Sequence, residues 1–141
     1  METDLPANLL RMSHVLLVED DPLMSDLYKA ILTNGGIEVT HVSSGKAALA
    51  TLKKLRPDLV VLDMMMPEMS GVDVLKKMRS QPKLADIPVV VSSNFADGDH
   101  EKVALAAGAT KYILKSAYLP AAFLAFIRET LEELAQVKPA K

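Results

Sequence analysis

The chain has 141 residues, of which 50% are hydrophobic and 24% charged, and its formal net charge is −2. These values are typical of one soluble globular domain and do not favour direct nucleic-acid binding. The absence of cysteine excludes disulfide frameworks, thiolate nucleophiles and Cys-based zinc sites. No apolar run approaches the roughly 18 residues that cross a bilayer. The opening METDLPANLLRMSH carries acids where a signal peptide carries bases, so we expect a cytoplasmic protein with no membrane partner.

The first predicted unit is a buried strand followed by a helix. VLLV, residues 15–18, is a continuous apolar run, as expected of a strand covered on both faces. Asp21 and Pro22 then supply a helix N-cap and a first helical residue. The helix ends at NGG, residues 34–36. Its two apolar stripes are Leu23, Leu27 and Ile31, and Met24, Tyr28 and Leu32.

Two further units follow. Residues 37–42, IEVTHV, alternate in polarity and are typical of an edge strand. The helix after SSG places Ala48, Leu49, Leu52 and Leu55 on one side, and Pro57 ends it. LVVLD, residues 59–63, predicts a central strand, and SGVDVLKKMR, residues 70–79, predicts a short helix. Its inward residues are expected to be Val72, Leu75 and Met78.

The last two units complete the alternation. Residues 87–93, IPVVVSS, predict a strand, and residues 97–109 predict a helix that ends at Gly108. KYILK, residues 111–115, predicts a short strand. The final helix is expected over residues 120–134, with Phe123, Ile127, Leu131 and Leu134 on one stripe.

Strict alternation of strands and helices indicates an α/β protein whose sheet is parallel and covered by helices on both faces. The chain shows no internal repeat and no low-complexity segment. We therefore expect one domain over residues 13–135. Residues 1–12 are expected to be an N-terminal tail, and residues 136–141 a C-terminal tail or linker.

Reactive side chains follow four of the predicted strands. Glu19, Asp20 and Asp21 come after the first strand and Asp63 closes the third. Ser93 and Lys115 close the fourth and the fifth. In an open α/β sheet, ligands bind outside the carboxyl ends of the strands, so these groups are expected to meet at one rim. Asp21, next to Pro22, is expected to act as the helix cap rather than as a ligand.

The chemistry of this group indicates phosphoryl transfer. Clustered carboxylates attract a hard divalent cation such as Mg²⁺. One aspartate can then act as a nucleophile toward phosphorus, while the metal and Lys115 balance the charge of the transferred oxygens. Ser93 is placed to hydrogen-bond one of those oxygens.

Four motifs, in their order and spacing, carry a family resemblance. They are VLLVEDD, PDLVVLDMMMPEMSG, IPVVVSS and AGATKYILK. Over residues 14–134 the chain resembles the receiver domains of two-component response regulators, in particular those that stand alone as chemotaxis regulators. The resemblance implies a flavodoxin-like, doubly wound sheet of five parallel strands in the order 2-1-3-4-5.

The resemblance also implies a role for each matching residue. Asp63 is the phosphoacceptor, Asp20 the direct metal ligand, and Glu19 an acid that acts through water. Met65 lends its backbone carbonyl to the Mg²⁺ or Mn²⁺ ion. The remaining assignments are Ser93 as the switch hydroxyl, Tyr112 as the aromatic residue that moves inward with it, and Lys115 as the phosphate-pairing lysine; Pro67 and Gly71 belong to the turn after the acceptor.

The chain departs from the family pattern in three places. Ser116 stands where a proline, often cis, usually follows the lysine. Asn94 replaces a smaller residue and is expected to narrow access for a phosphodonor. Met65 and Phe95, two residues beyond the acceptor and the switch hydroxyl, are bulky and apolar. We hypothesise that they shield the phosphoryl group from water and slow its hydrolysis.

The resemblance implies a signalling switch that catalyses only its own phosphorylation and dephosphorylation. A sensor histidine kinase or a His-containing phosphotransfer protein would be the donor, and a downstream protein would be the target. The output surface would be the fourth helix, fifth strand and fifth helix. We expect a monomer or weak homodimer that does not bind nucleic acid directly, because no DNA-binding segment follows Leu134.

Two other classes of protein fit the sequence less well. A haloacid-dehalogenase-type phosphatase needs a second Asp where Met65 stands, and a flavin carrier needs a first loop without three acids. A receiver fragment of a larger response regulator or hybrid kinase stays open, as does a non-phosphorylated interaction module. Met64 to Met66 are expected to pack, not to bind a soft metal. The three histidines, His14, His41 and His100, are expected to be incidental, and no Ser-His-Asp triad is expected.

Overall fold

A computed structural model describes residues 12–117 and 120–136. Its sheet has five strands in the order β2-β1-β3-β4-β5, and all four neighbouring pairs are parallel. The strands are β1 His14–Val18, β2 Glu38–Val42, β3 Leu59–Asp63, β4 Val89–Ser93 and β5 Lys111–Leu114. The doubly wound, flavodoxin-like fold expected from the sequence is thereby confirmed.

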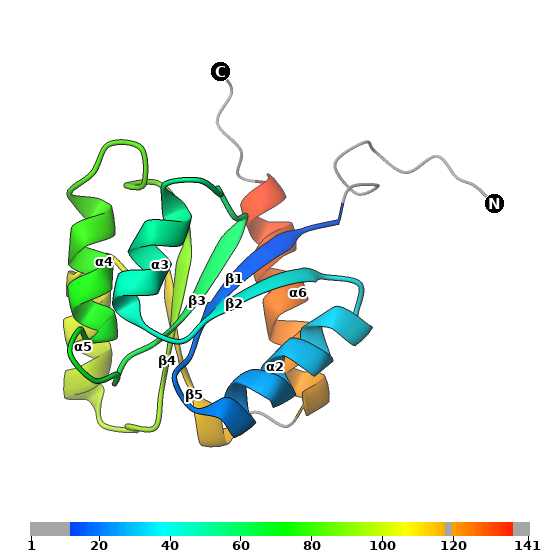
Figure 1. Cartoon of the computed structure of the whole chain (residues 1–141). Coiled ribbons are helices and arrows are strands. Elements are labelled where there is room, and N and C mark those ends of the chain that lie inside the picture. Colours follow the sequence, from blue (N-terminus) through cyan, green and yellow to red (C-terminus); the bar gives the residue numbers. More distant parts are fainter. Residues whose placement is uncertain (1–11, 118–119, 137–141) are drawn as a thin grey trace.

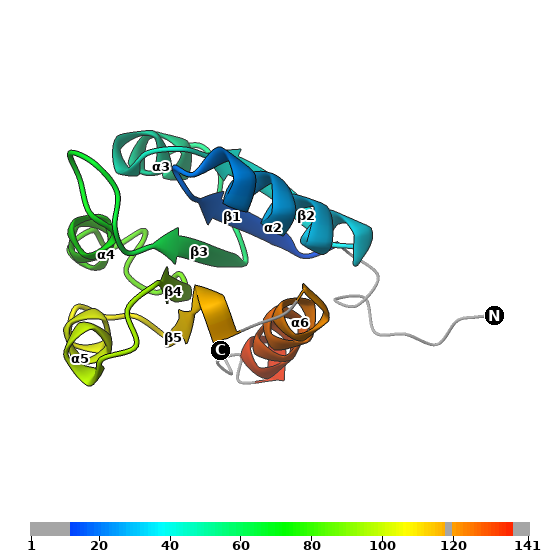
Figure 2. The same cartoon turned by 90° about the horizontal axis from the view of Figure 1, so that it is seen from below.

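Helices cover both faces of the sheet. They are α2 Pro22–Asn34, α3 Gly45–Leu52, α4 Gly71–Arg79, α5 Gly98–Ala106 and α6 Pro120–Gln136. Figures 1 and 2 show α2 and α6 on one face and α3, α4 and α5 on the other. Because side chains alternate along a strand, Val15 and Leu17 pack under α2 and α6 whereas Leu16 and Val18 pack on the opposite side.

The helix caps follow the sequence closely. Asp21 precedes Pro22, and its carboxylate accepts the Leu23 N–H at 2.9 Å, which confirms its role as a cap. Ser70 and Asp73 form a reciprocal capping box at the start of α4. These caps fix the residues at which α2 and α4 begin, next to the carboxyl ends of the strands.

Only part of the helix pattern was predicted correctly. On α2 the stripe of Met24, Tyr28 and Leu32 faces the core, but Leu23 and Leu27 are 80% and 45% exposed. This helix covers one sheet face beside α6, so a single stripe is buried. On α5 the regular helix ends at Ala106 because Gly108 has φ +112, a left-handed conformation that does not continue an α-helix.

Arg79 connects the loops at the edge of the molecule where the strands begin. Its guanidinium donates to the carbonyl of Gly108 at 2.9 Å and to that of Ile87 at 2.8 Å. These bonds join the end of α4 to the segments that enter β4 and β5. A preformed set of loops therefore surrounds the amino ends of the strands.

Candidate functional site

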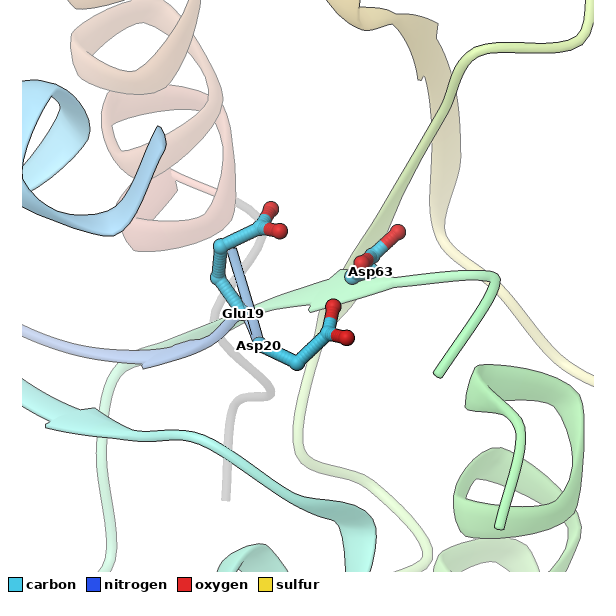
Figure 3. Close-up of side chains that lie close together, drawn as sticks. All are labelled: Glu19, Asp20 and Asp63. Atoms are coloured by element: carbon cyan, nitrogen blue, oxygen red, sulfur yellow. The ribbon is translucent and has the colours of Figure 1, made fainter. Parts of the chain in front are cut away.

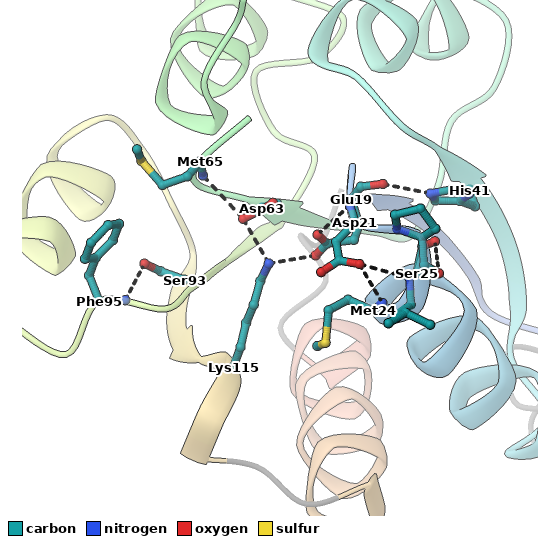
Figure 4. Close-up of polar contacts among 12 residues, drawn as sticks. Glu19, Asp21, Met24, Ser25, His41, Asp63, Met65, Ser93, Phe95 and Lys115 are labelled. Carbon is teal, nitrogen blue, oxygen red and sulfur yellow. Dashed lines mark hydrogen bonds and ion pairs between the residues drawn. The ribbon is translucent and has the colours of Figure 1, made fainter. Parts of the chain in front are cut away.

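Three strand ends deliver charged side chains to one buried position. Glu19 follows β1, Asp63 closes β3, and Lys115 follows β5 (Figure 4). The ammonium nitrogen Nζ of Lys115 lies 2.9 Å from Glu19 Oε1 and 3.1 Å from Asp63 Oδ1. The lysine side chain is only 8% exposed, so both ion pairs are shielded from solvent.

Carboxylate oxygens gather around this lysine. Glu19, Asp20 and Asp63 each offer one oxygen, and the three oxygens lie within 4.8 Å of one another. Figure 3 shows Glu19 and Asp20 at the end of β1 with their carboxylates turned toward Asp63. The expected acidic rim is thus assembled from two separate strands.

The residues fit a hard divalent cation. Glu19 Oε1 is buried and has no directional hydrogen bond, although it is ion-paired with Lys115. Two carboxylates from β1 and one from β3 are the oxygen donors that Mg²⁺ or Mn²⁺ prefers. A cation at this position would satisfy the free lone pairs of Glu19 and offset the mutual repulsion of the acids.

The electrostatics of the site are strongly perturbed. Burial raises the pKa of Asp63 to about 7, and the negative charge of Glu19 adds to this rise. Lys115 and the Met65 N–H act in the opposite direction. Burial alone would lower the pKa of Lys115, but its contacts with Glu19 and Asp63 outweigh that effect and raise the pKa. The lysine therefore stays charged as a counter-ion of two acids.

The turn after Asp63 is shaped by a glycine. The Gly71 N–H donates to the Met64 carbonyl at 2.9 Å. A Cβ built on Gly71 would collide with the backbone carbonyl of Asp63. Only glycine allows this close approach, which sets the first residue of α4 directly against the backbone of Asp63. The Met65 N–H, in the same turn, donates to Asp63 Oδ1 at 3.3 Å, while the Met65 side chain is 55% exposed.

The hydroxyl at the end of β4 is bonded within its own loop. Ser93 is buried, and its Oγ accepts the Phe95 N–H at 3.0 Å. The Tyr112 hydroxyl donates to the Phe95 carbonyl at 2.8 Å. Asn94, between Ser93 and Phe95 in the chain, is exposed. Ser93 and Tyr112 are thus joined through the backbone of Phe95 and not through the Glu19–Lys115–Asp63 group.

Phe95 itself packs against a histidine. Its ring stacks on His100 with 4.2 Å between the centroids, and His100 Nδ1 lies 2.6 Å from Asp97 Oδ1. Ser116, the residue in place of the usual proline, lies in the 3₁₀ turn Lys115–Ala117.

His41, which was expected to be incidental, has a hydrogen-bond partner at the acidic rim. His41 on β2 lies with Nε2 2.9 Å from the backbone carbonyl oxygen of Glu19, so Nε2–H donates to that oxygen. The Glu19 N–H donates to the Val42 carbonyl at 3.1 Å, which extends the β1–β2 ladder by one bond. Beyond the end of β2 at Val42, the His41 side chain supplies the donor for the Glu19 carbonyl. Its bond fixes the peptide between Glu19 and Asp20, the two acids of the rim.

The fold and this rim together define a class of signalling domain. The family model described as "Response regulator receiver domain" matches residues 15–125. The chain therefore belongs to this family of two-component receiver domains. The resemblance inferred from the four motifs is therefore confirmed. Among the described residues, no helix is both long enough and apolar enough to traverse a membrane.

Two curated relatives illustrate the sequence similarity. The DNA-binding response regulator MtrA of Mycolicibacterium smegmatis is 32% identical over 117 residues, covering 83% of this chain and 50% of that protein. The probable transcriptional regulatory protein TcrX of Mycobacterium tuberculosis is 37% identical over 102 residues, covering 72% of this chain and 42% of that protein. The chain thus spans about half the length of the curated relatives it matches.

Two solved structures illustrate the similarity of fold. The signal receiver domain of a signal transduction histidine kinase from Syntrophus aciditrophicus has a TM-score of 0.79 and 29% identity, covering 92% of this chain and 97% of that one. The chemotaxis response regulator CheY4 of Vibrio cholerae has a TM-score of 0.79 and 27% identity, covering 84% of this chain and 98% of that one.

Proposed function

We propose that the chain is a phosphorylation-dependent switch whose phosphoacceptor is Asp63. The observation that carries the proposal is the buried contact of Lys115 with both Asp63 and Glu19, at the point where three strands end. A structural ion pair needs one acid, whereas a phosphoryl site needs an acceptor, a cation site and a separate ammonium group. Asp63, Lys115 and the neighbouring acids meet that requirement.

The donor would be a phosphohistidine of a sensor kinase or of a phosphotransfer protein. An Asp63 carboxylate oxygen bonds to phosphorus as the P–N bond breaks, and the imidazole keeps the electron pair and takes up a proton. Glu19, Asp20, Asp63 and the Met65 carbonyl would hold Mg²⁺ or Mn²⁺, which supplies positive charge for the transferred oxygens. Lys115 then pairs with one phosphoryl oxygen.

Ser93 and Tyr112 would convert this event into a change of surface. In the unphosphorylated chain Ser93 Oγ accepts the Phe95 N–H, and Tyr112 donates to the Phe95 carbonyl. A phosphoryl oxygen on Asp63 offers Ser93 an acceptor for its own proton, so the loop that carries Phe95 is pulled toward Asp63. Tyr112, bonded to the same residue, would follow.

The output face would be α5, β5 and α6. Ala104 is the one buried residue of α5, all of which is described. Val103 and Leu105 are 50% and 44% exposed. A helix held by so little burial shifts at low cost, and its exposed apolar residues suit a downstream protein target. A monomer or weak homodimer without direct nucleic-acid binding is part of this proposal.

A second candidate is a receiver that belongs to a larger response regulator or hybrid kinase. It is favoured by one observation, the chain's coverage of about half of relatives such as MtrA. The same phosphorylation site would serve it, and the output would then pass to another domain. A non-phosphorylated interaction module is the remaining alternative.

The decisive experiment is incubation with acetyl phosphate and MgCl₂, followed by intact mass spectrometry. We expect one phosphoryl adduct in the wild type and none in Asp63→Asn. A matched control, Asp58→Asn, removes an aspartate at the opposite end of β3 and should be labelled normally. Equal labelling of Asp63→Asn and the wild type would overturn the acceptor assignment. Because exposed Asn94 is expected to restrict small donors, beryllofluoride and a histidine kinase serve as further donors or mimics.

The bulky residues near the acceptor give a second measurable expectation. Met65 and Phe95 should shield the phosphoryl group, so the phosphorylated chain should persist well beyond seconds. Decay of the adduct after donor removal measures this, and Met65→Asn should shorten the lifetime by admitting water. A wild-type lifetime of only seconds would refute the hypothesis of slow hydrolysis.

A further inference from the structure

The surface is hollowed at the end of the sheet where the strands begin. The hollow has a volume of about 460 Å³. It lies between two loops, residues 53–58 before β3 and residues 80–88 before β4, which lie toward the upper edge of Figure 1. Its volume falls within the range of roughly 300–1,000 Å³ typical of ligand sites. The lining consists of Leu52, Lys53, Lys54, Leu55, Arg56, Pro82, Lys83, Leu84 and Asp86.

This hollow, called the basic hollow below because Lys53, Lys54, Arg56 and Lys83 line it, has an apolar floor. Hydrogen bonds of Arg56 hold its two walls together. Leu52 and Leu84 are only 5% and 6% exposed. Arg56 bridges the two loops, because one guanidinium nitrogen donates to the Lys83 carbonyl at 2.8 Å and the other contacts Asp86 at 2.8 Å. The hollow is therefore formed before any partner arrives, which lowers the entropic cost of binding.

The walls of the hollow carry lysines that are not needed for ion pairs within the described part of the chain. Within residues 12–117 and 120–136, Lys53, Lys54 and Lys83 make no ion pair. The one carboxylate in the lining, Asp86, is engaged by Arg56, which holds the pKa of Asp86 below its usual range. Three ammonium groups thus surround an apolar floor in a chain whose net charge is −2. Lys53 also complements the end of α3, but Lys83 has no such role.

We propose that the basic hollow binds an acidic segment of a partner protein, with one apolar side chain on the Leu52–Leu84 floor and flanking carboxylates beside Lys53, Lys54 and Lys83. A bare phosphate fits less well, because the backbone N–H groups of Lys53 and Lys54 already donate to carbonyls of α3. Nucleic acid also fits less well, since the lining residues include no aromatic ring for base stacking.

The site would work independently of phosphorylation. The strands β3 and β4, each of five residues, separate the hollow from Asp63 and Ser93. At about 3.3 Å per residue this is a separation of roughly 16 Å, beyond direct contact and beyond the screening length in physiological salt. The acidic segment would keep the chain at a location or beside a kinase whether or not Asp63 is phosphorylated. This proposal does not rest on the proposed phosphorylation of Asp63.

The test uses ¹⁵N-labelled whole chain and a synthetic peptide with one leucine between two runs of glutamate. Peptide addition should shift the amide resonances of residues 52–56 and 82–86. The double variant Lys53→Glu/Lys83→Glu should weaken binding by about tenfold or more, the equivalent of roughly 1.4 kcal/mol. The matched variant Lys29→Glu/Lys102→Glu reverses two other exposed lysines and should bind as the wild type does. Replacing the peptide leucine by serine should also weaken binding.

Four results would overturn the proposal: no shifts at residues 52–56 and 82–86, equal binding by the Lys53→Glu/Lys83→Glu variant, equal binding of the serine peptide, or tighter binding of an oligothymidylate of equal charge in the same hollow. Repetition with beryllofluoride and MgCl₂ checks independence from Asp63. An affinity unchanged within about twofold, or 0.4 kcal/mol, supports it, and a larger change contradicts it.

Discussion

The two ends of the sheet hold clustered charges in opposite ways. At the carboxyl ends of the strands, Lys115 is buried between Glu19 and Asp63, and each charge depends on its neighbour. At the amino ends, Lys53 and Lys83 are exposed around the basic hollow, and solvent screens them. The difference teaches that burial, more than residue type, separates the charges proposed to serve chemistry from those proposed to serve recognition. Changing a charge should therefore alter stability strongly at the first end, in a direction that depends on the residue, and hardly at all at the second.

The largest effect is expected for Lys115→Met. The substitution keeps the side-chain volume but leaves Glu19 and Asp63 without their buried counter-ion. We expect the free energy of unfolding to fall by about 3 kcal/mol at neutral pH without metal, as for other broken buried pairs. Urea denaturation measures this loss, and Lys29→Met on the exposed face of α2 is the control. Equal stability of the two variants would break the proposed contrast.

Asp63→Asn should act in the opposite direction on stability. The native pKa of Asp63 is raised to about 7, whereas the unfolded value is near 4, so the native state binds the proton more tightly. The carboxylate therefore costs stability progressively as pH rises from about 4 to about 7. In chelator-treated buffer Asp63→Asn should be more stable than the wild type by about 2 kcal/mol at pH 8. This is roughly half of the ~4 kcal/mol that a pKa rise from about 4 to about 7 represents, because Asn also removes one charged partner of Lys115.

The gain from Asp63→Asn should shrink as the pH falls toward 4, because the native carboxyl is then protonated and the unfolded one is about half protonated. Urea denaturation across this pH range measures the trend. A stability difference that stays constant between pH 4 and pH 8 would show that the native pKa of Asp63 is not raised.

A smaller effect is expected at His41. His41→Ala removes the donor that fixes the Glu19–Asp20 peptide, and we expect Mg²⁺ affinity to fall about fivefold, close to the value of one neutral hydrogen bond. His41→Gln keeps an N–H donor and should recover part of the affinity. Isothermal titration calorimetry provides this measurement.

His14→Ala is the matched control for His41. It removes a histidine at the other end of the β1–β2 pair, where His14 Nε2 lies 2.7 Å from Thr40 Oγ1. Its Mg²⁺ affinity should equal that of the wild type. If His41→Ala binds Mg²⁺ as the wild type does, His41 only packs. If the wild type binds no Mg²⁺, the cation site itself is wrong.

The smallest effect is expected at the hollow. Lys53→Glu and Lys83→Glu should each change the free energy of unfolding by less than about 0.5 kcal/mol, because both side chains are exposed and make no ion pair within the part of the chain that the structure describes. Thermal unfolding measures this. A loss comparable to that of Lys115→Met would assign these lysines to the fold instead of to a partner.

The fold and the acidic rim were predictable for local reasons. Strands such as VVL before Asp63 are continuous apolar runs, and parallel strands bring their carboxyl ends to one edge. Asp21 with Pro22 is a local cap signal that needs no tertiary information. These features depend on sequence neighbours and on one general rule of topology.

The features that were missed depend on contacts between distant segments. The bond from His41 to Glu19 exists only in the register that pairs His41 with Leu17. The Phe95–His100 stack depends on how the loop before α5 folds back. The hollow arises where two loops from different units meet, and no single stretch of sequence contains its shape.

Gly71 has a consequence for interpreting variants of this chain. Its close approach to the Asp63 backbone means that any side chain at this position displaces Asp63, the proposed acceptor, while leaving its carboxylate chemically intact. A genetic screen for loss of signalling should therefore recover Gly71 together with Asp63, although glycine carries no reactive group. Variants at Gly71 belong with those of the acceptor when sequences are sorted into active and inactive receivers.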